Sequence, residues 1–387
     1  MALLSRKRLL MAKIEGTYGT DPTVAGTDAV LVSSLEISPV ESETVGRDII
    51  REYLGTSEQL LSNTRVNITF EAELAGSGTA GSVSKLDALF RSCGFAAATT
   101  GSAITGTAQS GGAGTITLAS GASSADDYYN GMAIAITSGT GNGHKGLITD
   151  YVGSSKVATV IPSSTATFVP GTSSGYSISA NVNYKPLSTS FESCTLYFNN
   201  SGILHKATGC RGTFSFTIET SGIPKFQFNM TGIYNSPTDT SAPSTTYSAQ
   251  SVPVLAKAGN TVATSILGYQ SAAVQSLSFD IANEVTYRDL IGTDKSVLIT
   301  NREPTGEASI ELPTIAAKDY YTLATSDTTS LVAFQHGVTA GNIFSFVAPT
   351  VDLGNPTLSD SDGIQMISLP LNFLPNSGND ECVLTFQ

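Results

Sequence analysis

The sequence predicts an all-β protein with one or two short helices, and three observations support this class. The 387 residues include 37 glycines, and only 13% of the residues are charged, a composition typical of short strands joined by many turns. Residues 66–74 alternate strictly between apolar and polar side chains, which is the pattern of a strand with one buried and one solvated face. Long stretches with helical periodicity are almost absent.

One short helix is predicted after this strand. Ser84 and Asp87 have the spacing of a capping box, in which each side chain bonds a backbone amide of the first turn. Gly94 stands where a left-handed residue commonly ends a helix. Between these signals, apolar residues recur at helical spacing, namely Leu86, Leu89, Phe90 and Cys93. A strand followed by a short helix is therefore the predicted building unit.

Three glycines between the strand and the helix, Gly76, Gly78 and Gly81, match the G-x-G-x-x-G pattern of dinucleotide-binding sites. Two features argue against a cofactor. The preceding strand has a polar face, whereas the parallel strand of such a site is buried on both faces and almost wholly apolar. The acidic residue expected about 20 positions further on is missing, because residues 96–100 contain no carboxylate. We interpret the glycines as a flexible connection and predict no cofactor.

In chain order, residues 1–30 begin with basic side chains and continue with turn residues, and we expect them to dock on a neighbouring molecule or remain mobile. A first strand is predicted at residues 31–37. Residues 38–65 form a long polar connection, and connections of that length are usually functional or contact another element. Residues 235–260 are rich in Ser, Thr and Pro, which indicates a linker or a long surface loop.

The composition changes over residues 101–180, where Gly, Ser, Thr and Ala dominate. Short strand candidates separated by turn signals indicate a small Ig-like β-sandwich that is inserted into the chain. The candidates are residues 115–118, 132–137, 146–151, 156–160 and 175–178.

The last third of the chain repeats the first. Short strings of residues 35–74 recur in the same order within residues 279–312; Arg-Asp-Ile-Ile, for example, returns as Arg-Asp-Leu-Ile. Several matches in one order indicate an internal duplication. We predict a first unit made of residues 1–100 plus 181–250, and a second unit made of residues 251–387.

The sequence shows no catalytic or metal-binding signature, and we predict that the protein is not an enzyme. Its three histidines are isolated, and its four cysteines are widely spaced without a ligand pattern, which favours buried free thiols. A net charge of −12 argues against binding nucleic acid by phosphate neutralisation and against an anionic membrane surface. No stretch approaches the roughly 20 apolar residues of a membrane span, so no membrane insertion is expected.

The chain resembles the major tail tube proteins of long, flexible-tailed (siphovirus-like) bacteriophages. The strings that carry the resemblance are MAKIEGTYGTDP (11–22), FEAELAGSG (70–78), LFRSCGF (89–95) and HKATGCRGT (205–213). It covers most of residues 1–100 and 181–387. Residues 108–179 are similar to small β domains that decorate several phage virion proteins.

This resemblance implies a virion structural protein that polymerises as stacked rings into the tail tube, with sheets of neighbouring subunits joined into one barrel around a lumen. The tube is the conduit for genomic DNA to the host, and the DNA passes transiently without sticking. The implied partners are further copies of the chain, the tape measure protein, and tail terminator and distal tail proteins. The implied location is the virion tail, after assembly in the host bacterial cytoplasm.

The duplication adds an expectation about symmetry. Family members with one unit are expected to form rings of six, so a chain with two units implies a trimeric ring with pseudo-sixfold symmetry; a hexamer is the alternative. The rival functional hypotheses are a carbohydrate-binding or adhesive virion decoration protein and a β-rich hydrolase.

Two sets of site residues follow from this interpretation. Polar residues of alternating strands are candidates for the lumen face, although the alternation fits a strand facing the outer solvent equally well. The lumen candidates are Asn67, Thr69, Glu71, Glu73, Ser309 and Glu311. Two charged segments, residues 38–65 and 282–305, are candidates for contacts between stacked rings. Their candidate residues are Glu41, Glu43, Arg47, Asp48, Arg288 and Asp289. No catalytic, cofactor-binding or metal-binding residue is predicted.

Overall fold

Antiparallel strands make up most of the structure, a computed structural model that describes residues 4–163, 167–292, 294–326 and 328–387. Within these ranges there are two α-helices, α1 at Asp87–Ser92 and α2 at Tyr320–Ala324, and a 3-10 turn. The prediction of an all-β protein with one or two short helices is confirmed.

The chain outside residues 101–180 divides into two parts that we call the first and the second half. The first half contains β1 (Arg8–Ile14), β2 (Ala29–Val30), β3 (Ser33–Val45), β4 (Leu60–Glu73), β5 (Phe95–Thr100), β13 (Asn181–Pro186), β14 (Cys194–Asn200), β15 (Ile203–Glu219), β16 (Lys225–Tyr234) and β17 (Thr238–Asp239). The second half contains β18 (Thr261–Ser265), β19 (Val274–Asp280), β20 (Asn283–Arg288), β21 (Ser296–Arg302), β22 (Thr305–Glu311), β23 (Ser330–His336), β24 (Phe344–Leu353), β25 (Thr357–Ser361), β26 (Ile364–Phe373) and β27 (Val383–Phe386).

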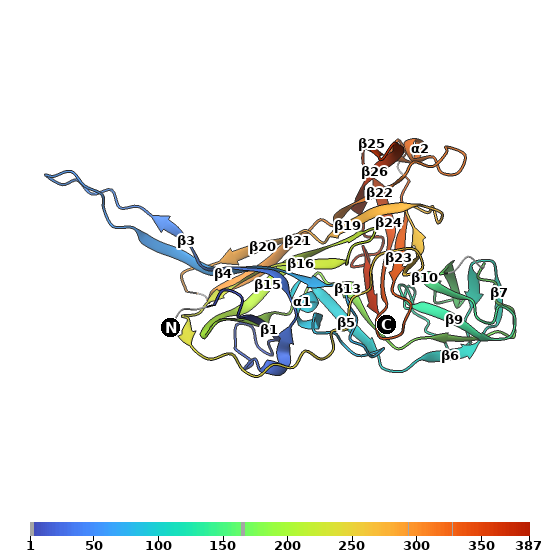
Figure 1. Cartoon of the computed structure of the whole chain (residues 1–387), viewed down its shortest axis with the longest axis horizontal. Helices are drawn as coiled ribbons and strands as arrows, with labels where there is room; N and C mark the ends of the chain where they lie inside the picture. Colours follow the sequence, from blue (N-terminus) through green and yellow to red (C-terminus); the bar gives the residue numbers. More distant parts are fainter. Residues whose placement is uncertain (1–3, 164–166, 293, 327) are drawn as a thin grey trace.

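Both halves contribute to one 18-stranded sheet, from which β20 and β21 are separated as a two-stranded hairpin (Figure 1). Eight of its strands follow one another in the spatial order β3, β4, β16, β15, β19, β22, β26 and β25, all antiparallel. We call these eight strands the long sheet. Its first four strands belong to the first half and its last four to the second, and β15 pairs with β19 at the junction.

The inserted residues form a separate seven-stranded sheet at the end of the molecule opposite the β3–β4 hairpin (Figure 1). Its strands are β6 (Ile104–Thr107), β7 (Ser110–Gly112), β8 (Thr115–Thr117), β9 (Ala133–Ser138), β10 (Lys145–Val152), β11 (Val157–Pro162) and β12 (Gly175–Ile178). The five strands expected from the sequence correspond to β8 through β12. The composition of β6 and β7, mostly Gly, Ser and Thr, gave no strand signal. Apolar side chains of this sheet form a core separate from the main core. On the other side of the sheet, Leu147 and Ile161 contact Ala333 of β23.

The main core is aromatic and lies between the long sheet, α1 and the strands of both halves. Phe90 of α1 contacts five rings at centroid distances of 5.0 to 5.8 Å. They are Tyr184, Phe214, Phe226, Phe228 and Phe386. Apolar side chains of both halves form a single buried cluster here, so the halves share one core.

The capping box expected for α1 does not form, because Leu86 is the N-cap residue and no side chain caps the helix. The backbone amide of Leu86 donates to Ser84 Oγ at 3.2 Å, and Gly94 ends the helix with φ +85°. The carboxylate of Asp87, however, accepts from the hydroxyl of Tyr184 at 2.9 Å and from Arg91 at 3.2 Å. A buried tyrosine hydroxyl needs a hydrogen-bond partner, and this tertiary contact replaces the local cap.

The expectation that residues 1–30 dock on a neighbouring molecule or remain mobile is wrong for the described part. β1 pairs along its whole length with β14 of the same chain. The buried Glu15 carboxylate then accepts from the hydroxyls of Ser193 and Thr195, both at 2.6 Å, and from the amide of Gly209 at 2.7 Å. These long-range bonds anchor the segment, and sequence alone does not reveal them.

Residues 38–65 are not simply a connection, because β3 and β4 extend through half of them as a ribbon that projects from the molecule (Figure 1). We call residues 38–65 the arm. Register shifts interrupt the β3–β4 pairing at three places, which explains why the strand pattern is not visible in the sequence. Polar side chains bond across the ribbon, as Arg65 does with Glu41 at 2.5 Å.

We expect Phe90→Ala to lower the free energy of unfolding by about 3 to 5 kcal/mol, because it removes the ring at the centre of the shared core. Urea denaturation followed by circular dichroism measures this loss, and Phe90→Leu should lose less. A loss below about 1 kcal/mol would contradict the central role of Phe90.

Candidate functional site: the polar face of the long sheet

The long sheet has one polar face that runs without interruption across the junction between the halves. Residues that stand directly opposite one another in neighbouring strands point to the same side of a sheet. One such row crosses from β4 to β26 through Glu71, Gln227, Ser215, Asp280, Thr305 and Asn372. A second row contains Glu73, Lys225, Thr217, Ser278 and Glu307. The opposite face carries the aromatic residues of the core.

All six lumen candidates lie on this polar face, in two groups separated by β16, β15 and β19. Asn67, Thr69, Glu71 and Glu73 belong to β4, while Ser309 and Glu311 belong to β22. Sequence reasoning missed the residues between the two groups. Their signal was present, because Ser215 and Thr217 alternate with Phe214 and Phe216, but alternation does not show which strands are neighbours.

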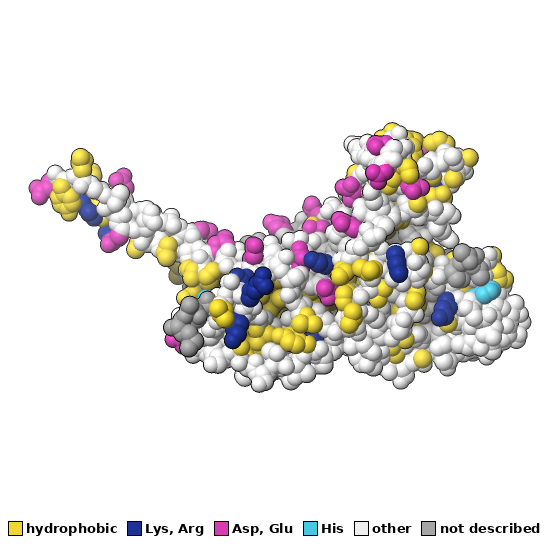
Figure 2. Space-filling view, in the orientation of Figure 1, with side chains coloured by type: hydrophobic (Ala, Val, Ile, Leu, Met, Phe, Trp, Pro, Cys, Tyr) yellow, Lys and Arg dark blue, Asp and Glu magenta, His cyan; other side chains and the backbone are white. Residues whose placement is uncertain are grey.

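The polar face is acidic. From β4 to β22 it carries six carboxylates, which are Glu71, Glu73, Glu219, Asp280, Glu307 and Glu311, and three basic side chains, which are Arg65, Arg211 and Lys225. Lys225 Nζ lies 2.8 Å from the Glu71 carboxylate, and this hydrogen bond holds the pKa of Glu71 below its ordinary value. In Figure 2 acidic side chains gather along the upper edge of the molecule, between the arm and β25. A surface of one sign repels a polyanion.

The candidates for contacts between rings fall into two different environments. Four of them lie on the projecting arm, where Glu41 bonds Arg65, Glu43 bonds the Asn63 amide and Arg47 pairs with Glu58, while Asp48 is exposed. Arg288 and Asp289 lie at the end of the β20–β21 hairpin, where Asp289 pairs with Lys295 at 3.2 Å. The hairpin meets the base of the arm, because the Tyr287 hydroxyl donates to the Thr64 carbonyl at 2.9 Å.

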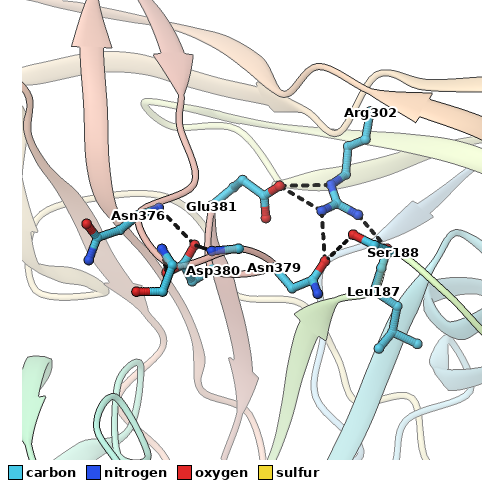
Figure 3. Close-up of polar contacts among 9 residues, drawn as sticks. Leu187, Ser188, Arg302, Asn376, Asn379, Asp380 and Glu381 are labelled. Atoms are coloured by element: carbon cyan, nitrogen blue, oxygen red, sulfur yellow. Dashed lines mark hydrogen bonds and ion pairs between the residues drawn. The ribbon is translucent and has the colours of Figure 1, made fainter.

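The β20–β21 hairpin, which makes up most of the predicted contact segment 282–305, packs on its own chain. Arg302 at its base makes an ion pair of 2.7 Å with Glu381 and donates to the Leu187 carbonyl at 2.7 Å (Figure 3). Asn379 accepts from both Arg302 and Ser188 at the same place. The base of the hairpin is therefore fixed to β13 and to the segment before β27.

The histidines and cysteines lie in separate structural contexts. His336 bonds Thr261 and the Val254 carbonyl, and His205 packs on Phe198. All four cysteines are buried and free, and burial raises the pKa of the Cys93 and Cys210 thiols. Among the residues that the structure describes, there is no group of three or more His, Cys, Asp or Glu side chains suited to a metal ion. No helix in those ranges is long and apolar enough to cross a membrane.

Comparison with known proteins gives one family. The family model described as "Phage tail tube protein" matches residues 5–374, which include the long sheet, the arm and the inserted sheet. No curated protein matches the chain. The match covers nearly the whole sequence, and the strands that it spans carry the continuous acidic face described above. The chain therefore belongs to the phage tail tube protein family.

Proposed function

We propose that this chain polymerises as stacked rings into a phage tail tube and that the polar face of the long sheet lines the channel for genomic DNA. The observation that carries the proposal is the continuous acidic face, backed from β4 to β26 by the buried core. Such a face keeps a wet lumen and repels the phosphates of passing DNA, so the DNA moves without sticking. The role is structural rather than enzymatic.

The strand order supports two tube units in one chain. In the first half the order β3, β4, β16, β15 is accompanied by α1 after β4, and in the second half the order β19, β22, β26, β25 is accompanied by α2 after β22. We assign the first unit to residues 1–100 and 181–250, and the second to residues 251–387. Three chains then supply six units, which gives a trimeric ring with pseudo-sixfold symmetry.

The two terminal strands of the long sheet offer a way to close the ring. β3 and β25 are at opposite ends of the strand order, and β15–β19 is the internal example of a junction between units. Leu358 of β25 is 53% exposed although its direct partner, Ile367, is buried. Pairing of β25 with β3 of the next copy covers this leucine and satisfies the edges of both strands.

The inserted sheet extends from the end of the molecule opposite the arm, beside β23 (Figure 1). We assign it to the outside of the tube as a decoration, because its contact with the second half leaves the polar face of the long sheet uncovered. Assembly in the host cytoplasm would bring the rings together with the tape measure protein and with the proteins at either end of the tube.

Electron microscopy of the concentrated, purified protein tests the proposal. We expect hollow tubes or stacked rings of uniform bore, with threefold symmetry and three chains per ring. True sixfold symmetry with six chains per ring would contradict the trimer, and protein that never forms rings, even with the tail initiation proteins added, would contradict the tube.

The charge of the channel is tested by reversal on β22. The double variant Glu307→Lys and Glu311→Lys avoids Glu71, which already holds Lys225. We expect tubes to assemble but DNA ejection from virions to slow several-fold, because lysines attract the phosphates. The matched Gln variants remove charge without reversing it and should slow ejection less. Ejection kinetics equal to the wild type in the lysine variant would count against this face as the lumen.

A further inference from the structure

The arm carries apolar side chains that its own chain leaves exposed. Val45 and Leu60 stand opposite each other near the end of the ribbon and are 50% and 54% exposed. Ile50, Tyr53 and Leu54 between the strands are more exposed still. Hydrophobic side chains are visible along the arm in Figure 2. Gathered apolar residues on a projecting ribbon indicate a surface that another protein covers.

The second half contains a hairpin at the matching place, and its strands are covered, although Ile291 at its tip is fully exposed. Val297 of β21 is fully buried; its amide donates to the Tyr18 hydroxyl at 2.6 Å and its carbonyl accepts from Arg211 at 2.8 Å. The side-chain amide of Asn283 donates to the carbonyls of Cys93 and Gly212 at 2.8 and 3.0 Å. The β20–β21 hairpin of the second half thus packs on the first half of the same chain.

Strand register places the arm and this hairpin in equivalent positions. Ile37 of β3 stands opposite Ile68 of β4, and Phe279 of β19 stands opposite Gly306 of β22. Eight residues further along the chain are Val45, still in β3, and Tyr287, in β20. Val45 pairs with Leu60, and Tyr287 pairs with Val297. Leu60 therefore lies at about the level of Val297, the buried anchor of the hairpin: Leu60 is eight residues before Ile68, and Val297 is nine residues before Gly306.

The second half offers a receiving surface with the same plan. Tyr269 follows the end of β18 by four residues, as Tyr18 follows the end of β1. Gly354 directly follows β24, and its amide donates to the Pro370 carbonyl of β26 at 2.9 Å, so a glycine stands beside β26 as Gly212 stands beside β16. Tyr269 is half-buried, and Leu323 of α2 packs only partly into the core. In Figure 2 hydrophobic side chains show on the protruding part that holds α2 and β25.

We propose that the arm of one copy packs sideways on the second half of the neighbouring copy in the same ring, with Leu60 against Tyr269 and the bend at Gly354. The inference rests on the proposed ring assembly and changes the kind of contact that the arm makes. The sequence suggested contacts between stacked rings, whereas the internal hairpin indicates a lateral contact that joins units around one ring.

The test compares Leu60→Asp with Leu61→Asp. The two leucines are adjacent in β4, are 54% and 65% exposed, and point to opposite faces of the ribbon at this position. An aspartate at position 60 would be buried without a partner in the proposed contact, so we expect lateral association to weaken roughly 100-fold or more. Analytical ultracentrifugation should show Leu60→Asp as a monomer at concentrations where the wild type and Leu61→Asp form rings.

The possible outcomes distinguish an error in the contact proposed for the arm from an error in the proposed ring assembly. Single rings of Leu60→Asp that fail to stack would show an axial contact and overturn the proposal, and so would normal tubes. A wild-type protein that forms no rings would instead refute the proposed function. As a check that does not depend on the folding of Leu60→Asp, Leu60→Cys with Tyr269→Cys should give disulfide-linked oligomers under oxidation, since the native cysteines are buried. Absence of such oligomers from assembled rings would also overturn the proposal.

Discussion

The antiparallel pairing of β15 with β19 is the constraint on which the rest of the structure depends. Phe216 and Phe279 stand directly opposite each other at this junction, and their rings stack with centroids 5.3 Å apart. The pairing makes one sheet of the two halves and places their aromatic side chains in one core. Because side chains alternate along a strand, the same register also determines which polar residues share the other face.

That division explains how one sheet combines stability with a charged surface. Phe226 and Lys225 are adjacent in β16, yet the ring packs in the core and the ammonium group meets Glu71 on the polar face. Burial of the aromatic side chains supplies the apolar contacts, so the polar face can concentrate carboxylates whose mutual repulsion the core offsets. A sheet of this kind suits a wall between a wet channel and a dry interior.

The two halves differ most in what covers their hairpins. The hairpin of the second half buries Val297 against Tyr18 and Arg211, whereas the arm leaves Val45 and Leu60 exposed. The hairpin of the second half can be covered by the first half of the same chain. No further half precedes the first one, so the arm can be covered only by another copy. We therefore use the contact made inside the chain as the basis for the proposed contact between copies, because a closed ring of equivalent units repeats one kind of interface.

The sequence by itself determined the class and the local pattern: the alternation around Phe70, the short helix with Phe90, and the polar residues of β4 and β22 were all predicted from neighbouring residues. The tertiary structure decided the rest. Three partners of Glu15 lie almost 180 residues or more away, and the register shifts that obscure the strand pattern of the arm depend on pairing. The continuity of the polar face from Glu71 to Asp280 requires β16 and β15 between them. Periodicity is a local property of the chain. The order of the strands and the burial of their faces arise from contacts between distant segments. The sequence pattern of a segment is the same whichever strand it pairs with, so it cannot reveal that partner.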